Sequence, residues 1–259
     1  MTGDEVVSLD GAAVRVGGDL ILGPVDLTIR SGEHWVILGP NGSGKTTLLS
    51  LAGGWSQPSV GAVRVLGEEL GRVDVRRLRR RIGLVSHAVA DRIRPALAVE
   101  DVVLTGKASV LETWWQDLTE ADRRRARVSL EEVGCLGLAD RTLGSCSSGE
   151  RQLVLIARAL FGAHPLLLFD EPAAGLDLPA RERLLAAMTA VPEVTTVLAT
   201  HHLEEIPPTA THAALLRDGQ VLAAGPIGDV LVGAELSACF GMSIAVDHDD
   251  GRWRARAAS

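Results

Sequence analysis

The residues most clearly arranged for chemistry form a glycine-rich stretch, GPNGSGKTT, at positions 39–47. Its spacing fits the pattern G-x-x-x-x-G-K-[ST], with an apolar strand pattern before it and a helical pattern after it. Glycines let backbone N–H groups surround phosphate oxygens, and the positive end of the following helix favours the same anion. Lys45 can reach the outer phosphates of a nucleotide, and the Thr46 hydroxyl can bind Mg²⁺. The candidate phosphate-binding residues are Gly39, Pro40, Asn41, Gly42, Ser43, Gly44, Lys45, Thr46 and Thr47.

Two adjacent carboxylates, Asp170 and Glu171, follow the buried strand pattern LLLF at 166–169. Ligands bind at the carboxyl ends of the strands in open α/β sheets. Asp170 can hold Mg²⁺ through water, and Glu171 can orient or deprotonate an attacking water. Taken alone, the pair could simply end a strand at the surface. Combined with the phosphate loop, it indicates chemistry at a phosphoryl group.

Two weaker candidates accompany them. Ser147, Ser148 and Gly149 are small residues at the start of a helical pattern, where they could form an anion site or an ordinary N-cap. His201 follows the strand pattern TTVLAT, so we expect it at the same sheet edge as Asp170.

The elements that must position these residues alternate between strands and helices. Residues 6–15 and 25–29 alternate apolar and polar side chains, which is typical of half-buried antiparallel strands. A strand at 195–200 follows a strand at 166–169 and a helix at about 180–191, and this order predicts a parallel sheet. The remaining predictions are strands at 34–38 and 60–66, hairpins at 213–224 and 243–257, a helix from Thr119 to Gly134, and a helix after Ser147.

Composition narrows the function classes. The 259 residues are 46% hydrophobic and 23% charged with a net charge of −7, which does not indicate a general nucleic-acid binder. Cys135, Cys146 and Cys239 lack metal-ligand spacing and favour a reducing compartment. The acidic, polar start of the chain does not indicate a signal peptide, and no apolar run approaches the ~18 residues of a membrane span. A membrane role would therefore require a partner.

The motifs, in this order, resemble those of the ATP-binding-cassette (ABC) ATPases. GPNGSGKTT resembles the Walker A loop, LLLFDEP the Walker B strand, CSSGE the family signature, AGLD the D-loop with Asp177, and THH the switch-histidine loop. The resemblance extends from the first strands to about Leu231. It implies a P-loop α/β fold with a mostly parallel sheet core, an antiparallel β-subdomain and a helical subdomain at about 90–160.

The resemblance also implies roles for individual residues. Two cassettes would close head to tail around two ATP molecules, each touching the phosphate loop of one subunit and the signature segment of the other. Ser147, Ser148, Gly149 and Glu150 would then make the contact in trans. Glu171 would be the catalytic base, His201 would hold the γ-phosphate, and Thr46 and Asp170 would serve Mg²⁺.

The sequence departs from the family pattern at two positions near the nucleotide. His87 stands where the family usually has the Q-loop glutamine, and imidazole is a poor ligand for Mg²⁺. His87 could still hydrogen-bond the attacking water, or it could be a spectator at a strand end. Val16 falls about where an aromatic residue usually stacks on adenine, so base selectivity is expected to be lower and use of GTP stays open.

We therefore expect the ATP-binding and ATP-hydrolysing subunit of an ABC transporter, with ATP and Mg²⁺ as cofactors. The ABC domain is expected at 1–235, followed by a short hairpin tail at 236–259. The expected partners are a second cassette, in a homodimer or heterodimer, and separate transmembrane permease subunits, with no direct contact to nucleic acid. This places the chain in the cytoplasm, peripheral at the inner face of the cell membrane. Two alternatives stay open: a soluble ABC ATPase acting on ribosomes or DNA, and a nucleotide-binding module with little turnover.

Overall fold

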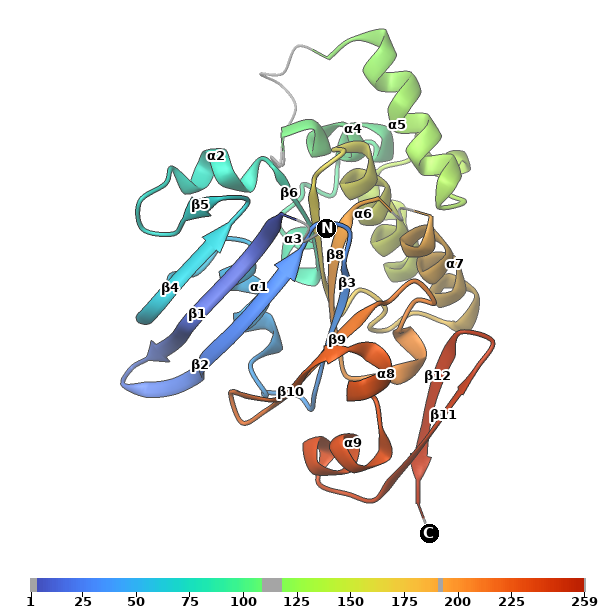
Figure 1. The fold of residues 1–259 in the computed structure, drawn as a ribbon. Coiled ribbons are helices and arrows are strands. Elements are labelled where there is room, and N and C mark those ends of the chain that lie inside the picture. Colours follow the sequence, from blue (N-terminus) through green and yellow to red (C-terminus); the bar gives the residue numbers. More distant parts are fainter. Residues whose placement is uncertain (1–3, 109–117, 191–192, 259) are drawn as a thin grey trace. The chain divides into compact units, whose positions relative to one another are not determined.

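A computed structural model describes residues 4–108, 118–190 and 193–258 of the chain. The described residues form two compact units (Figure 1). The first combines the residues up to Leu78 with those from 193 onward, and the second begins at Arg79 and contains the described residues up to 190. The boundary lies in helix α2 (Val75–Arg79).

The first unit contains an antiparallel sheet in the order β2-β1-β4-β5. β1 pairs with both β2 and β4, so the two alternating segments predicted near the start of the chain are neighbouring antiparallel strands. Buried and exposed residues alternate along much of β2, as expected for a strand with one covered face, whereas β1 has longer buried runs. The strands are β1 (Glu5–Val16), β2 (Asp19–Arg30), β4 (Val60–Val65) and β5 (Glu68–Glu69).

A second group of strands in this unit has the order β10-β9-β3-β8. β3 is parallel to both β8 and β9, whereas β10 returns antiparallel to β9. All five residues of β3 are buried, which explains the four apolar residues that follow His34. The strands are β3 (His34–Leu38), β8 (Thr195–Thr200), β9 (His212–Arg217) and β10 (Gln220–Pro226), and helix α1 (Lys45–Ala52) follows β3.

The C-terminal part of the first unit ends in the predicted hairpin. Its two strands flank Asp250 and Gly251, and Trp253 is buried with its ring stacked on His248 at 4.1 Å. Arg252 donates to the carbonyl of Glu204 at 3.5 Å. The elements are η4 (Leu203–Glu205), α8 (Ile227–Val230), α9 (Gly233–Phe240), β11 (Ile244–Asp249) and β12 (Arg252–Ala257).

The second unit contains two parallel strands and most of the helices. β6 (Ile82–Ser86) and β7 (Leu166–Asp170) run in register, so that Ser86 pairs with Asp170 at their carboxyl ends. The helices are α3 (His87–Ala90), α4 (Val99–Leu104), η1 (Thr105–Ala108), α5 (Glu120–Glu132), η2 (Leu136–Leu138), η3 (Leu143–Ser145), α6 (Ser148–Phe161) and α7 (Leu178–Thr189). The parallel strand pairs of both units and the separate antiparallel sheet confirm the predicted α/β fold class.

Predicted helix boundaries agree with the structure where the cap was recognised in the sequence. Thr119 caps α5 in a reciprocal capping box with Asp122, as expected. The helix predicted at 180–191 instead begins at Leu178, because Asp177 is its N-cap and Pro179 occupies the first turn. It ends at Thr189, and residue 191 lies outside the described part of the chain.

All three cysteines are free and buried, and burial raises the pKa of Cys135 and Cys239 to about 11, so both thiols stay protonated at neutral pH. Among the residues described, no helix has the length and apolar character that crossing a membrane requires.

Candidate functional site

The glycine-rich loop connects β3 to α1 in the first unit, as its sequence predicts. Gly42 and Gly44 have φ angles of 80° and 102°, a left-handed conformation that only glycine adopts without strain. Gly44 is also the N-cap of α1, so no side chain caps this helix start. The first-turn N–H groups of α1 therefore point out of the helix end, and they form a ready site for an anion.

Two side chains of the loop are buried against its backbone. Lys45 is 4% exposed, and its Nζ donates to the carbonyls of Gly39 at 2.9 Å and Pro40 at 3.1 Å. The buried Ser43 hydroxyl has no hydrogen-bond partner among the described residues. A buried hydroxyl without a partner costs about 1–3 kcal/mol, and a phosphate oxygen would satisfy it. The loop thus fits a polyphosphate group.

His201 lies at the same sheet edge as the loop. Leu38, the last residue of β3, pairs with Thr200, the last residue of the parallel strand β8. The loop after β3 and His201 after β8 therefore leave the sheet side by side. The His201 ring packs against that of His202 at 4.0 Å, and the backbone N–H of His202 donates to the Thr200 hydroxyl. This arrangement fixes the turn that carries His201.

Val16 lies at the end of β1, where it pairs with Asp19 across the turn to β2. Its side chain is 63% exposed. An exposed aliphatic side chain at this turn offers a smaller contact surface to a base than an aromatic ring would.

The acidic pair lies in the second unit at the end of β7. Asp170 is the last strand residue, and Glu171 directly follows it with a φ angle of 47°. A left-handed conformation is costly for glutamate, and the following Pro172 restricts it further. The turn is closed by the N–H of Ala174, which donates to the Glu171 carbonyl at 3.2 Å. Such backbone strain concentrates at functional positions.

The signature segment, residues 146–150, leads into α6. The Ser147 hydroxyl accepts from the N–H of Glu150 at 3.2 Å, and the Glu150 carboxylate accepts from the N–H of Ser147 at 2.7 Å. This capping box occupies two N–H groups, while Ser148 and Gly149 begin the helix at the protein surface. Cys146 is buried, in keeping with a small apolar packing residue at this position.

Asp177 begins α7 in the same unit. Its Oδ1 accepts from the N–H of Ala180 at 2.9 Å, so the residue has a structural role as an N-cap.

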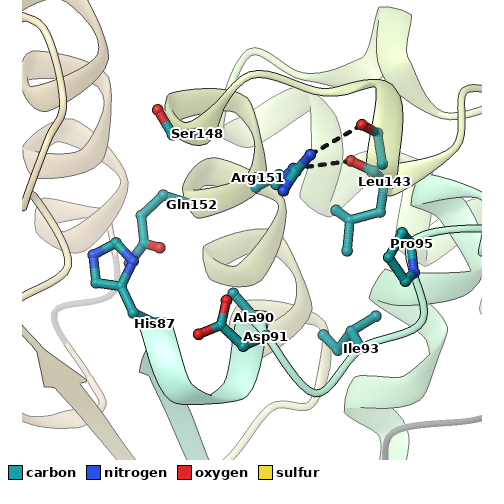
Figure 2. Close-up of a pocket in the computed structure, with 10 residues that line it drawn as sticks. His87, Ala90, Asp91, Ile93, Pro95, Leu143, Ser148, Arg151 and Gln152 are labelled. Atoms are coloured by element: carbon teal, nitrogen blue, oxygen red, sulfur yellow. Dashed lines mark hydrogen bonds between the residues drawn. The ribbon is translucent and has the colours of Figure 1, made fainter.

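His87 is the first residue of α3, directly after β6. It lines a cavity of about 300 Å³ within the second unit (Figure 2). The lining residues are His87, Ala90, Asp91, Ile93, Pro95, Leu143, Gly144, Ser148, Arg151 and Gln152. The cavity thus lies between the residue that follows β6 and the first turns of α6.

Sequence reasoning missed Arg151 and Gln152, two of the three polar side chains that α6 contributes to this cavity; the third is Ser148. Arg151 donates to the carbonyls of Leu143, Gly144 and Cys146 at 2.9–3.1 Å and so fixes the segment before the helix. Gln152 is only 2% exposed. Gln152 directly precedes Leu153, where the apolar face of the helix begins. This position is the sequence signal that could have indicated a buried amide.

The sequence-predicted residues divide between the two units. The loop, Val16 and His201 belong to the first; Asp170, Glu171, Asp177, the signature segment and His87 belong to the second. Thr46 and Asp170 offer the hard oxygen ligands that Mg²⁺ prefers. Among the described residues, no group of three or more His, Cys, Asp or Glu side chains gathers to hold a metal.

Comparison with known proteins identifies the family. The family described as ABC transporter matches residues 22–174, which is more than half of the chain. The ABC transporter ATP-binding protein YlmA of Bacillus subtilis (strain 168) is 37% identical over 248 residues, which cover 93% of each chain. The chain belongs to the ABC transporter family.

Solved structures of ABC cassettes have the same fold. CbiO1 from Clostridium perfringens, part of the transporter complex cbiONQ, is 25% identical with a TM-score of 0.77 and covers 91% of this chain and 94% of its own. The dimeric cassette MJ0796 bound to ADP and Pi is 26% identical with a TM-score of 0.75 and covers 85% and 98%. The cassette described here is thus an ATP-binding subunit of an ABC transporter, and the alternative of a role on ribosomes or DNA finds no support.

Proposed function

We propose that this cassette binds Mg-ATP, hydrolyses it in a dimer and thereby drives transport by separate membrane subunits. The observation that carries the proposal is the loop between β3 and α1. It combines left-handed glycines, the uncapped start of α1 and a buried Ser43 hydroxyl that lacks a partner among the described residues. Each of these features is stabilised by a bound phosphate.

Individual residues of the cassette would then have different roles in hydrolysis. The loop N–H groups and Lys45 hold the phosphates, and His201, which leaves the same sheet edge, holds the γ-phosphate. Glu171 orients the attacking water and accepts its proton. Thr46 and Asp170 are the residues that would hold Mg²⁺, which when bound supplies charge neutralisation at the phosphates.

The signature segment would complete the site of a second cassette. Ser148 and Gly149 start α6 at the protein surface, so their N–H groups can meet the γ-phosphate of an ATP held by the partner. The dimeric MJ0796 cassette, solved with ADP and Pi, supports a dimer as the working form. The second cassette is either a copy of this chain or a related chain.

The membrane partner would dock at the cavity beside His87. We infer this from its place between α3 and the signature helix α6, where a bound segment would act on both. CbiO1, a structural neighbour, is part of a transporter complex, which supports a separate membrane partner. The cassette would then lie at the cytoplasmic face of the cell membrane.

His87 would change the rate of ATP turnover, and Val16 would change the nucleotide selectivity; neither residue would be essential for hydrolysis. If His87 contacts the attacking water, His87→Gln and His87→Ala should both change turnover and its pH dependence; unchanged values in both would refute that role. The exposed Val16 predicts weak discrimination between ATP and GTP.

A phosphate-release assay with Glu171→Gln tests the proposed hydrolysis. Because a general base contributes about 10²–10⁴-fold, turnover should fall by at least about 100-fold while ATP binding persists. The same variant should accumulate a dimer with Mg-ATP, measured by size-exclusion chromatography with light scattering. Glu132→Gln, an exposed change on α5, is the matched control.

Wild-type protein that binds ATP without releasing phosphate would instead favour the nucleotide-binding module with little turnover. Equal turnover in wild type and Glu171→Gln would remove Glu171 from the catalytic role.

A further inference from the structure

Gln152 is a buried amide whose donor group lacks a partner in the part of the chain that the structure describes. The residue lies in the second turn of α6 and is 2% exposed. Its Nε2 is fully buried and has no hydrogen-bond partner among the described residues. Leaving such a buried donor unpaired is costly, so an acceptor within reach would be strongly favoured.

His87, which lines the same cavity from α3, offers such an acceptor. Both side chains line the same space within the second unit, and Figure 2 shows them pointing toward one another from α3 and α6. His87 is exposed, whereas Gln152 is held by the helix, so rotation of the histidine alone can join them. A neutral imidazole has one nitrogen that accepts a hydrogen bond.

The other polar groups of the cavity are less suitable. Arg151 is a donor only, and its guanidinium already serves three backbone carbonyls. Ser148 begins α6 one turn before Gln152 and is exposed at the protein surface. The Asp91 carboxylate is an acceptor, but it follows the other end of α3, whereas Figure 2 shows the imidazole of His87 directed toward the amide. A substitution of Asp91 therefore tests whether its carboxylate, and not the imidazole, is the group that matters.

We propose that the Nε2–H of Gln152 donates to the imidazole of His87, which fixes the tautomer and the direction of the ring. The bond ties the end of β6 to the helix that carries the signature segment. Gln152 is then a positioning residue for His87. It is His87 that stands where the family usually has the Q-loop glutamine. The link to turnover rests on the proposed function, whereas the bond itself does not.

The direct test is the tautomer of His87, read from the ring ¹⁵N shifts of histidine-labelled protein at pH 8 without nucleotide. In the wild type we expect one tautomer with one nitrogen accepting a hydrogen bond. Gln152→Met keeps the length of the side chain but removes the donor, and should give averaged shifts of two exchanging tautomers. Asp91→Asn should leave the wild-type shifts unchanged.

Two outcomes of this measurement would overturn the proposal. One is that Gln152→Met leaves the His87 shifts as they are in the wild type. The other is that Asp91→Asn, and not Gln152→Met, releases the tautomer. Circular dichroism of each variant verifies that the shifts come from folded protein.

A double-mutant cycle on ATP turnover gives the functional readout. Gln152→Met should lower kcat about fivefold with an unchanged KM for ATP, because the phosphate loop belongs to the other unit. In a His87→Ala background, Gln152→Met should not lower kcat further, because the hydrogen bond is already absent. Additive losses, or a change in KM alone, would contradict the pairing. Failure of turnover in the wild type would refute the proposed function and leave the tautomer measurement to decide the bond.

Discussion

Glu150 is a carboxylate at the position where the signature segment would meet a partner's ATP. A hydrogen bond from the backbone N–H of Ser147 lowers its pKa, and the Arg141 guanidinium lies 3.8 Å away. The side chain is therefore charged at neutral pH. A negative charge close to a triphosphate is repulsive, and Arg141 compensates for it only in part.

We predict that Glu150→Gln strengthens ATP-dependent dimerisation. Glutamine can take the same place in a capping box, so the helix start is kept while the repulsion is removed. In a Glu171→Gln background, the ATP concentration for half-maximal dimer should fall about threefold to tenfold, measured by light scattering during an ATP titration. Glu150→Ala, which also removes the hydrogen bond from the N–H of Ser147, is the control and should lower the free energy of unfolding by about 1 kcal/mol. A higher ATP requirement in Glu150→Gln would mean that the carboxylate contributes favourably to the dimer.

At the scale of elements, α7 depends on Asp177 for its start. The carboxylate accepts from the N–H of Ala180, and this cap sets the helix two residues earlier than the apolar pattern alone indicated. We predict that Asp177→Ala lowers the free energy of unfolding by about 0.5–2 kcal/mol, and that Asp177→Ser, which can still cap, largely preserves it. Urea denaturation measures both.

The same two variants separate the cap from a direct role in the nucleotide site. If capping is the main role, Asp177→Ser should retain most of the ATP turnover. Loss of turnover in Asp177→Ser at normal stability would show that the carboxylate acts beyond the cap, as the D-loop resemblance implies.

Elements with local signals could be predicted from the sequence. The run HWVIL indicated the bounds of β3, and the glycine loop and the Thr119 capping box indicated the starts of α1 and α5. Local patterns carry this information because strand burial and helix capping involve residues that are close in sequence.

The cavity beside His87 could not be predicted in the same way. It combines His87, Leu143 and Gln152, which are far apart in the chain and meet only after α3, η3 and α6 pack together. Likewise, the left-handed backbone of Glu171 has no local sequence signal, since glutamate rarely adopts it. Both features depend on tertiary structure.

For the whole molecule, the two units should respond differently to acid. His164 and Asp122 both belong to the second unit. Burial, with a smaller effect of the Arg158 charge, lowers the pKa of His164 to about 4, and backbone hydrogen bonds with Gly106 and Arg80 offset this only partly. The hydrogen bond from Lys107, at 2.8 Å, contributes most to lowering the pKa of Asp122.

Folding lowers the pKa of both groups, so acid removes stability through each of them. An unfolded histidine has a pKa near 6.5, so between about pH 6.5 and 4 the unfolded chain binds a proton at His164 that the folded chain does not. Stability from His164 is therefore complete above about pH 6.5 and is lost as the pH falls toward 4. Stability from Asp122 is complete above the ordinary carboxyl pKa of about 4 and is lost below it.

We predict that acidification from pH 7 to 5 opens the second unit before the first. Hydrogen exchange, corrected for its intrinsic pH dependence, should show protection falling in α4 and α6 while β3 and β8 keep theirs. His164→Gln should reduce this pH dependence, because the group that takes up the proton is gone. His248→Gln, an exposed change in the first unit, should not. An equal loss of protection in both units would show that acid acts on the cassette as one cooperative body, because a proton taken up at His164 would then cost stability in strands that do not contain it.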